Sequence, residues 1–306
     1  MVNLLDKEYA ENALKLYQTN KFETRDKSWN NCYNYFRTMI DKDYENLNIK
    51  EKEFAWLQLG FYLASWGMFR NSFLSQYDYS IYDKVLKIVL DKKYSILWNV
   101  GIDTLKYNKE EYVNKVFDIS KEINKTLREN RVFYNTKSIF QRKRTDESEI
   151  SQTLITKILL GVLGCCPAYD NYFNKAIKFG DKAFYSEKKF ENLVDNIVEN
   201  SILADLSKKY NLPIMKVVDI VYFQMGIEQD FKRMYELYID KNITPTNDKD
   251  WKIIAKSLKD FYQQTNIDGE RTINVAFKFD KAKIDKFIKN NKKNIDSALF
   301  QIVSQN

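Results

Sequence analysis

Charged side chains that could carry out acid–base or nucleophilic chemistry lie inside the most apolar stretches of the sequence. Lys216 and Asp219 are three residues apart in the run 214–223, which is otherwise apolar. This spacing places both side chains on one face of a helix. Because a buried charge is costly unless it is paired, the pattern predicts a Lys216–Asp219 ion pair. A desolvated lysine beside a carboxylate can also serve as a base or a nucleophile.

Two further charges occupy comparable positions. Asp170 follows a Gly-Cys-Cys-Pro turn, and Arg70 ends a long apolar run. We expect both to converge with the lysine and aspartate above in one polar pocket that has Lys216, Asp219 and Asp170 as its catalytic groups. The expected substrate-binding residues of this pocket are Arg70, Trp66, Tyr169 and Tyr222. The alternative interpretation is a set of separate ion pairs that fix the register of the helices.

The sequence contains no histidine. This absence excludes the Ser-His-Asp triad, the Cys-His dyad and every histidine-ligated metal site. The three cysteines, Cys32, Cys165 and Cys166, are an odd number with an adjacent pair, which predicts reduced thiols rather than a disulfide framework. We expect no metal. No nucleotide-binding glycine motif is present either, so we expect no cofactor.

The segment 159–170 resembles the helix-hairpin-helix of DNA glycosylases and related DNA-binding proteins. Leu163-Gly164 and Pro167-Ala168 correspond to its hydrophobic-glycine turn and to the helix that follows. In that motif the backbone N–H groups of the turn hold a DNA phosphate, so the resemblance implies that Gly164 contacts nucleic acid. Cys166 stands where the motif has its second glycine, and its Cβ atom would crowd the phosphate.

The segment 203–220 resembles a helix-turn-helix, with Asn211 in the turn and Leu212 plugging it. The helix after this turn carries Lys216 and Asp219 but is otherwise apolar, whereas a groove-reading face needs several polar side chains. We therefore expect this helix to be buried. Both this segment and the Gly-Cys-Cys-Pro segment also resemble parts of bacterial all-α proteins of unassigned function.

Basic residues gather in a segment with few apolar side chains, 136–149. The net charge of the chain is +7, from 49 basic and 42 acidic residues. We expect a basic loop in this segment whose nucleic-acid contacts are Lys137, Arg142, Lys143 and Arg144. The alternative interpretation is a solvated surface loop.

The elements that position these residues are predicted to be helices. Only 8 glycines and 3 prolines occur in 306 residues, which favours an all-α, multi-helix globule. One small hairpin near 266–279 is the exception, because apolar residues alternate over 272–279. The apolar run 54–69 predicts a buried helix, too short for a membrane span. Pro167 is expected to begin a helix, since proline suits the first helical position.

The basic loop 136–149 is predicted to separate an N-terminal lobe, 1–135, from a C-terminal lobe, 150–306. The alternative is a single continuous domain. Charged residues follow directly after Met1–Leu5, with no apolar leader segment, so we expect a cytoplasmic protein that does not enter a membrane.

Two functions follow from these patterns. The first is a nucleic-acid-binding helical protein that binds DNA or RNA, with a DNA-handling enzyme as its catalytic form. It requires a continuous basic face that includes the Gly164 turn. The alternative is a non-catalytic protein-interaction module whose embedded charges are structural. This alternative requires an exposed apolar patch for another protein or for a second copy in a homo-oligomer.

Overall fold

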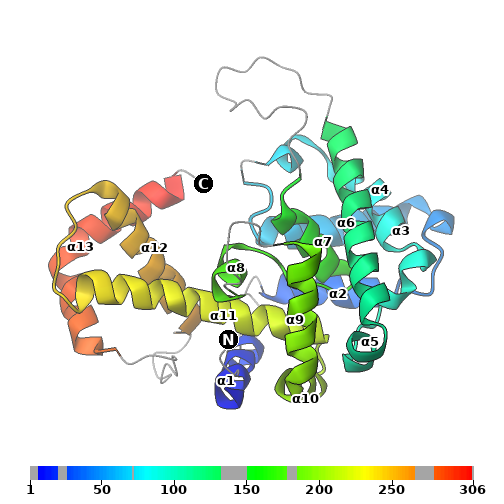
Figure 1. Ribbon diagram of the computed structural model, residues 1–306. Helices are drawn as coiled ribbons and strands as arrows, with labels where there is room; N and C mark the ends of the chain where they lie inside the picture. Colours follow the sequence, from blue (N-terminus) through cyan, green and yellow to red (C-terminus); the bar gives the residue numbers. More distant parts are fainter. Residues whose placement is uncertain are drawn as a thin grey trace. The chain divides into compact units, whose positions relative to one another are not determined.

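The computed structural model describes residues 6–19, 26–70, 72–131, 150–177, 185–265 and 279–304. All regular secondary structure in these ranges is helical, which confirms the predicted all-α class (Figure 1). The expected strand 272–279 lies outside the described residues except for Phe279. None of the described helices combines the length and the apolar composition that a membrane crossing requires.

The chain divides into two compact units, and the division does not follow the predicted boundary. The larger unit consists of Lys21–Asp170 and Phe179–Asp219, and the smaller unit of Met1–Asn20, Asn171–Lys178 and Ile220–Asn306. The two units do not divide at 136–149, because the helices on either side of that segment, α6 (Lys109–Arg131) and α7 (Gln152–Val162), pack against each other within the larger unit.

The larger unit is built around α7. The hydroxyl of Ser151 accepts a hydrogen bond from the backbone N–H of Leu154 at 3.2 Å and so caps the start of this helix. Every residue from Leu154 to Val162 is buried. The helix packs against α2 (Asp26–Arg37), α3 (Ile49–Ser65) and α6, so its apolar sequence is explained by neighbours on several sides.

Shorter elements complete the larger unit. Helix α6 contacts α4, α5 and α9, and α9 contacts α10. The bounds of these and the connecting 3₁₀ turns are η1 (Tyr44–Asn46), η2 (Phe73–Gln76), η3 (Tyr79–Tyr82), α4 (Asp83–Val89), η4 (Lys92–Leu97), α5 (Ile102–Tyr107), α9 (Glu187–Glu199) and α10 (Ser201–Tyr210).

Helix α3 is only partly buried, which corrects the prediction for the run 54–69. Its inner face buries Ala55, Trp56, Leu59, Gly60, Tyr62 and Leu63. The prediction fails on its outer face, where Phe54, Leu57 and Phe61 are exposed. The helix begins with a capping box, in which Asn48 and Glu51 each accept the other's backbone N–H.

The segment 163–170 has no helical structure, so the prediction that Pro167 begins a helix is wrong. The next helix, α8 (Asn171–Ile177), starts four residues later. The reason is that side chains satisfy the backbone of this segment. The N–H of Ala168 donates to Asp219 Oδ1 at 3.0 Å, and the N–H of Tyr169 donates to Thr156 Oγ1 at 2.9 Å.

The predicted turn at Asn211 is confirmed. Asn211 ends α10 in the left-handed conformation, with φ of 49°. Leu212 closes the turn, because its N–H donates to the carbonyl of Ser207 at 3.1 Å and its carbonyl accepts the Ser207 hydroxyl at 2.6 Å. Helix α11 (Ile214–Met234) follows, and its first two turns are buried as expected.

The smaller unit contains α1 (Lys7–Thr19), α8, most of α11, a π-helical turn (Tyr235–Ile239), α12 (Asp248–Thr265) and α13 (Lys281–Ser304). Its apolar core joins the end of α11 to α12 and α13. The rings of Phe231 and Phe261 stack at its centre, with centroids 3.6 Å apart.

Substitution of Gly226 tests the packing of α8 on α11. A Cβ atom at Gly226 would overlap the carbonyl oxygen of Tyr172 and lie 2.6 Å from its carbonyl carbon. In an open helix, Gly→Ala stabilises by about 1 kcal/mol. We expect Gly226→Ala instead to lower the free energy of unfolding by about 1–3 kcal/mol, because backbone atoms must move apart. Urea unfolding followed by circular dichroism measures this change.

The matched control is Gly101→Ala, since no atom lies within 4 Å of a Cβ built at Gly101. This substitution should change the free energy of unfolding by no more than about 1 kcal/mol. Equal effects of the two substitutions would contradict the close approach of α8 and α11.

Candidate functional site

Two of the predicted charges form a buried ion pair in the larger unit. Lys216 is 2% exposed, and its Nζ donates to Asp219 Oδ2 at 2.9 Å. The other carboxylate oxygen, Asp219 Oδ1, accepts the N–H of Ala168. Asp219 therefore neutralises a lysine on its own helix and also holds the segment 163–170 against α11.

A second lysine, which is not among the predicted site residues, lies beside this pair. Lys157 of α7 is 4% exposed, and its Nζ lies 3.8 Å from Asp170 Oδ2. That distance is an ion pair but is too long for a hydrogen bond. Lys157 was detectable, because it interrupts the apolar run 150–163 in the way that Lys216 interrupts its own run.

Two indole rings face the lysines. The Nζ of Lys157 lies 4.6 Å from the ring centroid of Trp66, and the Nζ of Lys216 lies 4.8 Å from that of Trp29 and 5.8 Å from that of Trp66. Trp29 is fixed in place, since its Nε1–H donates to the Leu160 carbonyl at 2.9 Å. At desolvated positions such contacts contribute roughly 2 kcal/mol each.

These residues are called the ionic cluster below: Lys157, Asp170, Lys216, Asp219, Trp29 and Trp66. Its two ammonium groups and two carboxylates balance in charge, as burial requires. The structure thus brings Lys216, Asp219, Asp170 and Trp66 together as predicted, and adds Lys157 and Trp29.

Arg70 and Tyr222, two other predicted pocket residues, are not placed in the ionic cluster. Arg70 is exposed, and its side chain folds back over Gly67, whose φ of 74° suits glycine. Tyr222 belongs to the smaller unit, where its ring lies 5.8 Å from that of Phe173.

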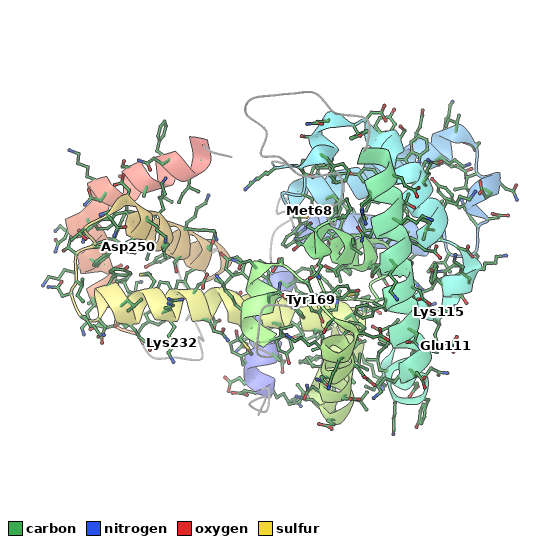
Figure 2. The ribbon with its side chains drawn as sticks, turned by 45° about the horizontal axis from the view of Figure 1, so that its top comes forward. Met68, Glu111, Lys115, Tyr169, Lys232 and Asp250 are labelled. Carbon is green, nitrogen blue, oxygen red and sulfur yellow. The ribbon has the colours of Figure 1, made fainter. Side chains whose placement is uncertain are left out.

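Tyr169, which is labelled in Figure 2, is buried. It directly precedes Asp170 of the ionic cluster in the sequence. Its backbone carbonyl accepts the hydroxyl of Thr153 at 2.9 Å, and its ring packs edge-on against Tyr185. These contacts fix the backbone that carries Asp170, so Tyr169 has a positioning role in the structure.

The Gly164 turn is buried, which corrects its assignment as a phosphate contact. A Cβ atom at this position would lie 2.9 Å from the ring of Tyr33 and 3.0 Å from Pro213. The Gly164 N–H already donates to the carbonyl of Leu159 at 3.0 Å, so it is not free to hold a phosphate. The other expected nucleic-acid contacts, Lys137, Arg142, Lys143 and Arg144, lie outside the described residues.

The cysteines are buried, as are the tyrosines beside them. Burial raises the pKa of the Cys166 thiol well above its usual range, and the nearby Cys165 and Asp219 raise it further. Burial also raises the pKa of Cys32 and of Cys165. A thiol that stays protonated is a poor nucleophile, so these cysteines are inert core residues. Within the described ranges, no group of three or more Cys, Asp or Glu could hold a metal ion.

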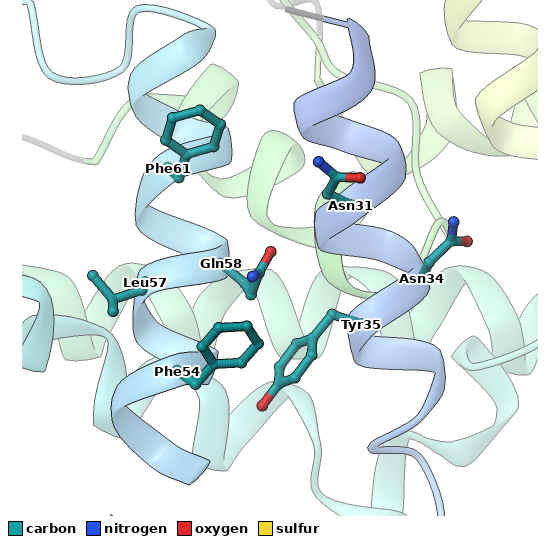
Figure 3. Close-up of a pocket in the computed structure, with 7 residues that line it drawn as sticks. All are labelled: Asn31, Asn34, Tyr35, Phe54, Leu57, Gln58 and Phe61. Carbon is teal, nitrogen blue, oxygen red and sulfur yellow. The ribbon is translucent and has the colours of Figure 1, made fainter. Parts of the chain in front are cut away.

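A groove of about 590 Å³ lies on the surface of the larger unit, between α2 and α3 (Figure 3). It is called the α2/α3 groove below. Its lining residues are Asn31, Asn34, Tyr35, Phe54, Leu57, Gln58 and Phe61. Phe54 is held by Tyr35, whose ring meets it edge-on at 5.1 Å. None of the seven lining residues is charged, and three of them are amides.

The apolar side chains of this groove stand open to solvent. Phe54 is 49% exposed, Leu57 48% and Phe61 66%. They follow each other at intervals of three and four residues, which places them on one stripe of α3. Figure 3 shows α3 beside α2, with Phe54 near Tyr35 and Phe61 level with Asn31. The two helices therefore run in opposite directions along the groove.

Removing one charge of the buried pair tests its structural role. Asp219→Asn leaves Lys216 buried without its carboxylate, so we expect the free energy of unfolding to fall by about 3–5 kcal/mol. Lys216→Met should also lower the free energy of unfolding. The double variant should lower it by less than the sum of the two single variants. Urea unfolding of all three gives the coupling energy.

The control pair is Lys93–Glu122, which is exposed and has an N–O distance of 2.9 Å. Lys93→Met should change stability by less than about 1 kcal/mol. An additive double variant at 216 and 219 would show that the two charges do not stabilise each other.

Alkaline pH should unfold the protein through its buried phenols. Burial raises the pKa of Tyr112, Tyr169 and Tyr185 well above the usual value near 10. In the unfolded chain these phenols ionise at about pH 10, so the unfolding free energy falls as the pH rises above that value. We expect part of the tyrosinate absorbance to appear only together with the loss of helical circular dichroism. Complete tyrosine titration in a chain that stays helical would contradict this expectation.

Comparisons of the chain with protein-family models, with curated proteins and with solved structures found no match. A function must therefore be inferred from the two features described above, the ionic cluster and the α2/α3 groove.

Proposed function

We propose that the protein is a non-catalytic helical interaction module whose α2/α3 groove binds the uncharged, apolar face of a helix from a protein partner. The observation that carries this proposal is the exposed stripe of Phe54, Leu57 and Phe61 on α3. Contiguous exposed apolar side chains on a folded protein mark a site of interaction.

The sequence of α3 supports this role. A helix that is apolar on all sides is normally buried on all sides. Helix α3 packs its inner face against α2 and α7, yet its outer face keeps two phenylalanines and a leucine in water. Covering the exposed half of each of these side chains contributes roughly 1 kcal/mol. A partner that covers the stripe would therefore gain several such contributions.

The lining of the groove indicates the chemistry of the partner. A charged side chain placed among seven uncharged residues would be desolvated without an opposite charge, which is costly. Asn31, Asn34 and Gln58 can each donate and accept hydrogen bonds, so they suit polar, uncharged groups at the edge of the contact. An amphipathic helix with apolar residues at intervals of three and four fits this groove.

The ionic cluster supports a structural rather than a catalytic role for the embedded charges. Both of its lysines are nearly fully buried, and both have a carboxylate partner. The second carboxylate oxygen of Asp219 accepts a hydrogen bond from the backbone N–H of Ala168. These contacts join α7, α11 and the segment 163–170, which is what a helix-fixing ion-pair network does.

A designed helical peptide tests the groove. The peptide carries a fluorophore, is stapled into a helix, and presents Phe, Leu and Phe at intervals of three and four on an uncharged face. We expect the protein to bind it in fluorescence anisotropy and Phe61→Asp to weaken binding at least tenfold, because a carboxylate in the groove would be desolvated.

The matched control is Tyr107→Asp, since Tyr107 of α5 is 71% exposed and lies outside the groove residues. It should bind the peptide like the unmodified protein, and circular dichroism should show that both variants stay folded. Equal binding by the two variants would contradict the proposal. Labelled duplex and single-stranded DNA form a second arm. DNA binding that persists at near-physiological salt, without peptide binding, would favour the nucleic-acid function instead.

A further inference from the structure

We infer that the partner helix is α3 of a second copy of this chain, so that two copies meet through their α2/α3 grooves about a two-fold axis. This inference rests on the proposed function and names the occupant of its groove. Helix α3 itself has the required chemistry, an uncharged face with Phe54, Leu57 and Phe61 at intervals of three and four.

The absence of charge from the groove lining favours a contact between identical surfaces. In a two-fold contact the same patch lies on both sides, so every side chain near the axis meets its own copy. A lysine or a glutamate there would face an equal charge and be repelled. None of the seven lining residues carries a charge at neutral pH. The surface thus lacks the groups that would prevent self-association.

The amides of the groove are suited to the same contact. An amide has an acceptor oxygen and a donor nitrogen, so it can pair with an identical amide across the axis. Asn31, Asn34 and Gln58 come from both helices that border the groove (Figure 3). A surface for a specific charged partner would instead present one type of charge.

The shape of the groove also fits a second copy. Helices α2 and α3 run in opposite directions, and the stripe on α3 projects beside the hollow between them (Figure 3). The stripe of one copy can therefore lie in the hollow of the other, with the reciprocal contact formed at the same time. Such packing would cover the apolar side chains of both copies at once.

The size of the groove and the charge of the chain predict how the dimer should behave. A stable interface uses about 20–30 residues on each side, many more than the seven lining residues. We therefore expect a dissociation constant in the micromolar range. Each copy carries a net charge of +7, so the two copies repel each other at a distance. Added salt screens this repulsion and should strengthen the dimer.

Sedimentation velocity over the micromolar range, at low and at high sodium chloride, tests the inference. We expect a monomer–dimer equilibrium that shifts toward dimer as the salt concentration rises. Phe61→Asp should raise the dissociation constant at least tenfold, because each copy would bring a carboxylate into the uncharged groove of the other, where it is desolvated. Tyr107→Asp should leave it unchanged, and the stapled peptide should compete with the dimer.

Cross-linking locates the contact independently of stability. The three natural cysteines are buried, so a single introduced cysteine supplies the reactive thiol. A short bismaleimide should join two copies of Leu57→Cys and should not join two copies of Tyr107→Cys.

The outcomes separate this inference from the proposed function. A chain that binds the peptide but stays monomeric would overturn the second copy as partner and leave the interaction module intact. A chain that neither binds the peptide nor dimerises would overturn both. A dimer that is insensitive to Phe61→Asp, or that salt weakens, would place the contact elsewhere on the chain and so contradict the inference.

Discussion

Electrical neutrality inside the larger unit is the constraint on which its core depends. Two ammonium groups lie there with almost no exposure to water, and each is near a carboxylate and an indole ring. Lys157 comes from α7, and Lys216 and Asp219 come from α11. Asp170 ends the segment 163–170, which connects α7 to α8. If these elements shifted relative to one another, a buried charge would lose its partner, at a cost of several kcal/mol. The ionic cluster thereby fixes their register.

Hydrogen bonds to the buried side chains, including Asp219 of the ionic cluster, explain why a stretch without helical structure can lie in the core. Buried backbone N–H groups need acceptors, and in the segment 163–170 two of them are supplied by Asp219 and Thr156. Gly164 allows the chain to turn tightly between Tyr33 and Pro213, where a Cβ atom would not fit. A tight glycine turn next to a helix serves packing here.

The groove on α3 has a different relation to the fold. The inner face of α3 packs against α2 and α7, but no described element covers Phe54, Leu57 and Phe61 on its outer face. Folding of the larger unit does not need these side chains in water, and their exposure costs solubility. The interaction surface that we propose would account for their exposure.

The sequence by itself determined the helical class, because glycine and proline, which interrupt helices, are scarce. It also determined the Lys216–Asp219 pair, since a separation of three residues on one helix suffices. Only the tertiary structure decided that Lys157 and Trp29 join this pair, that Arg70 is exposed, and that Pro167 does not begin a helix. It alone decided which face of α3 meets water. Local spacing reports which residues share a face of a helix, but what covers that face depends on residues far away in the chain.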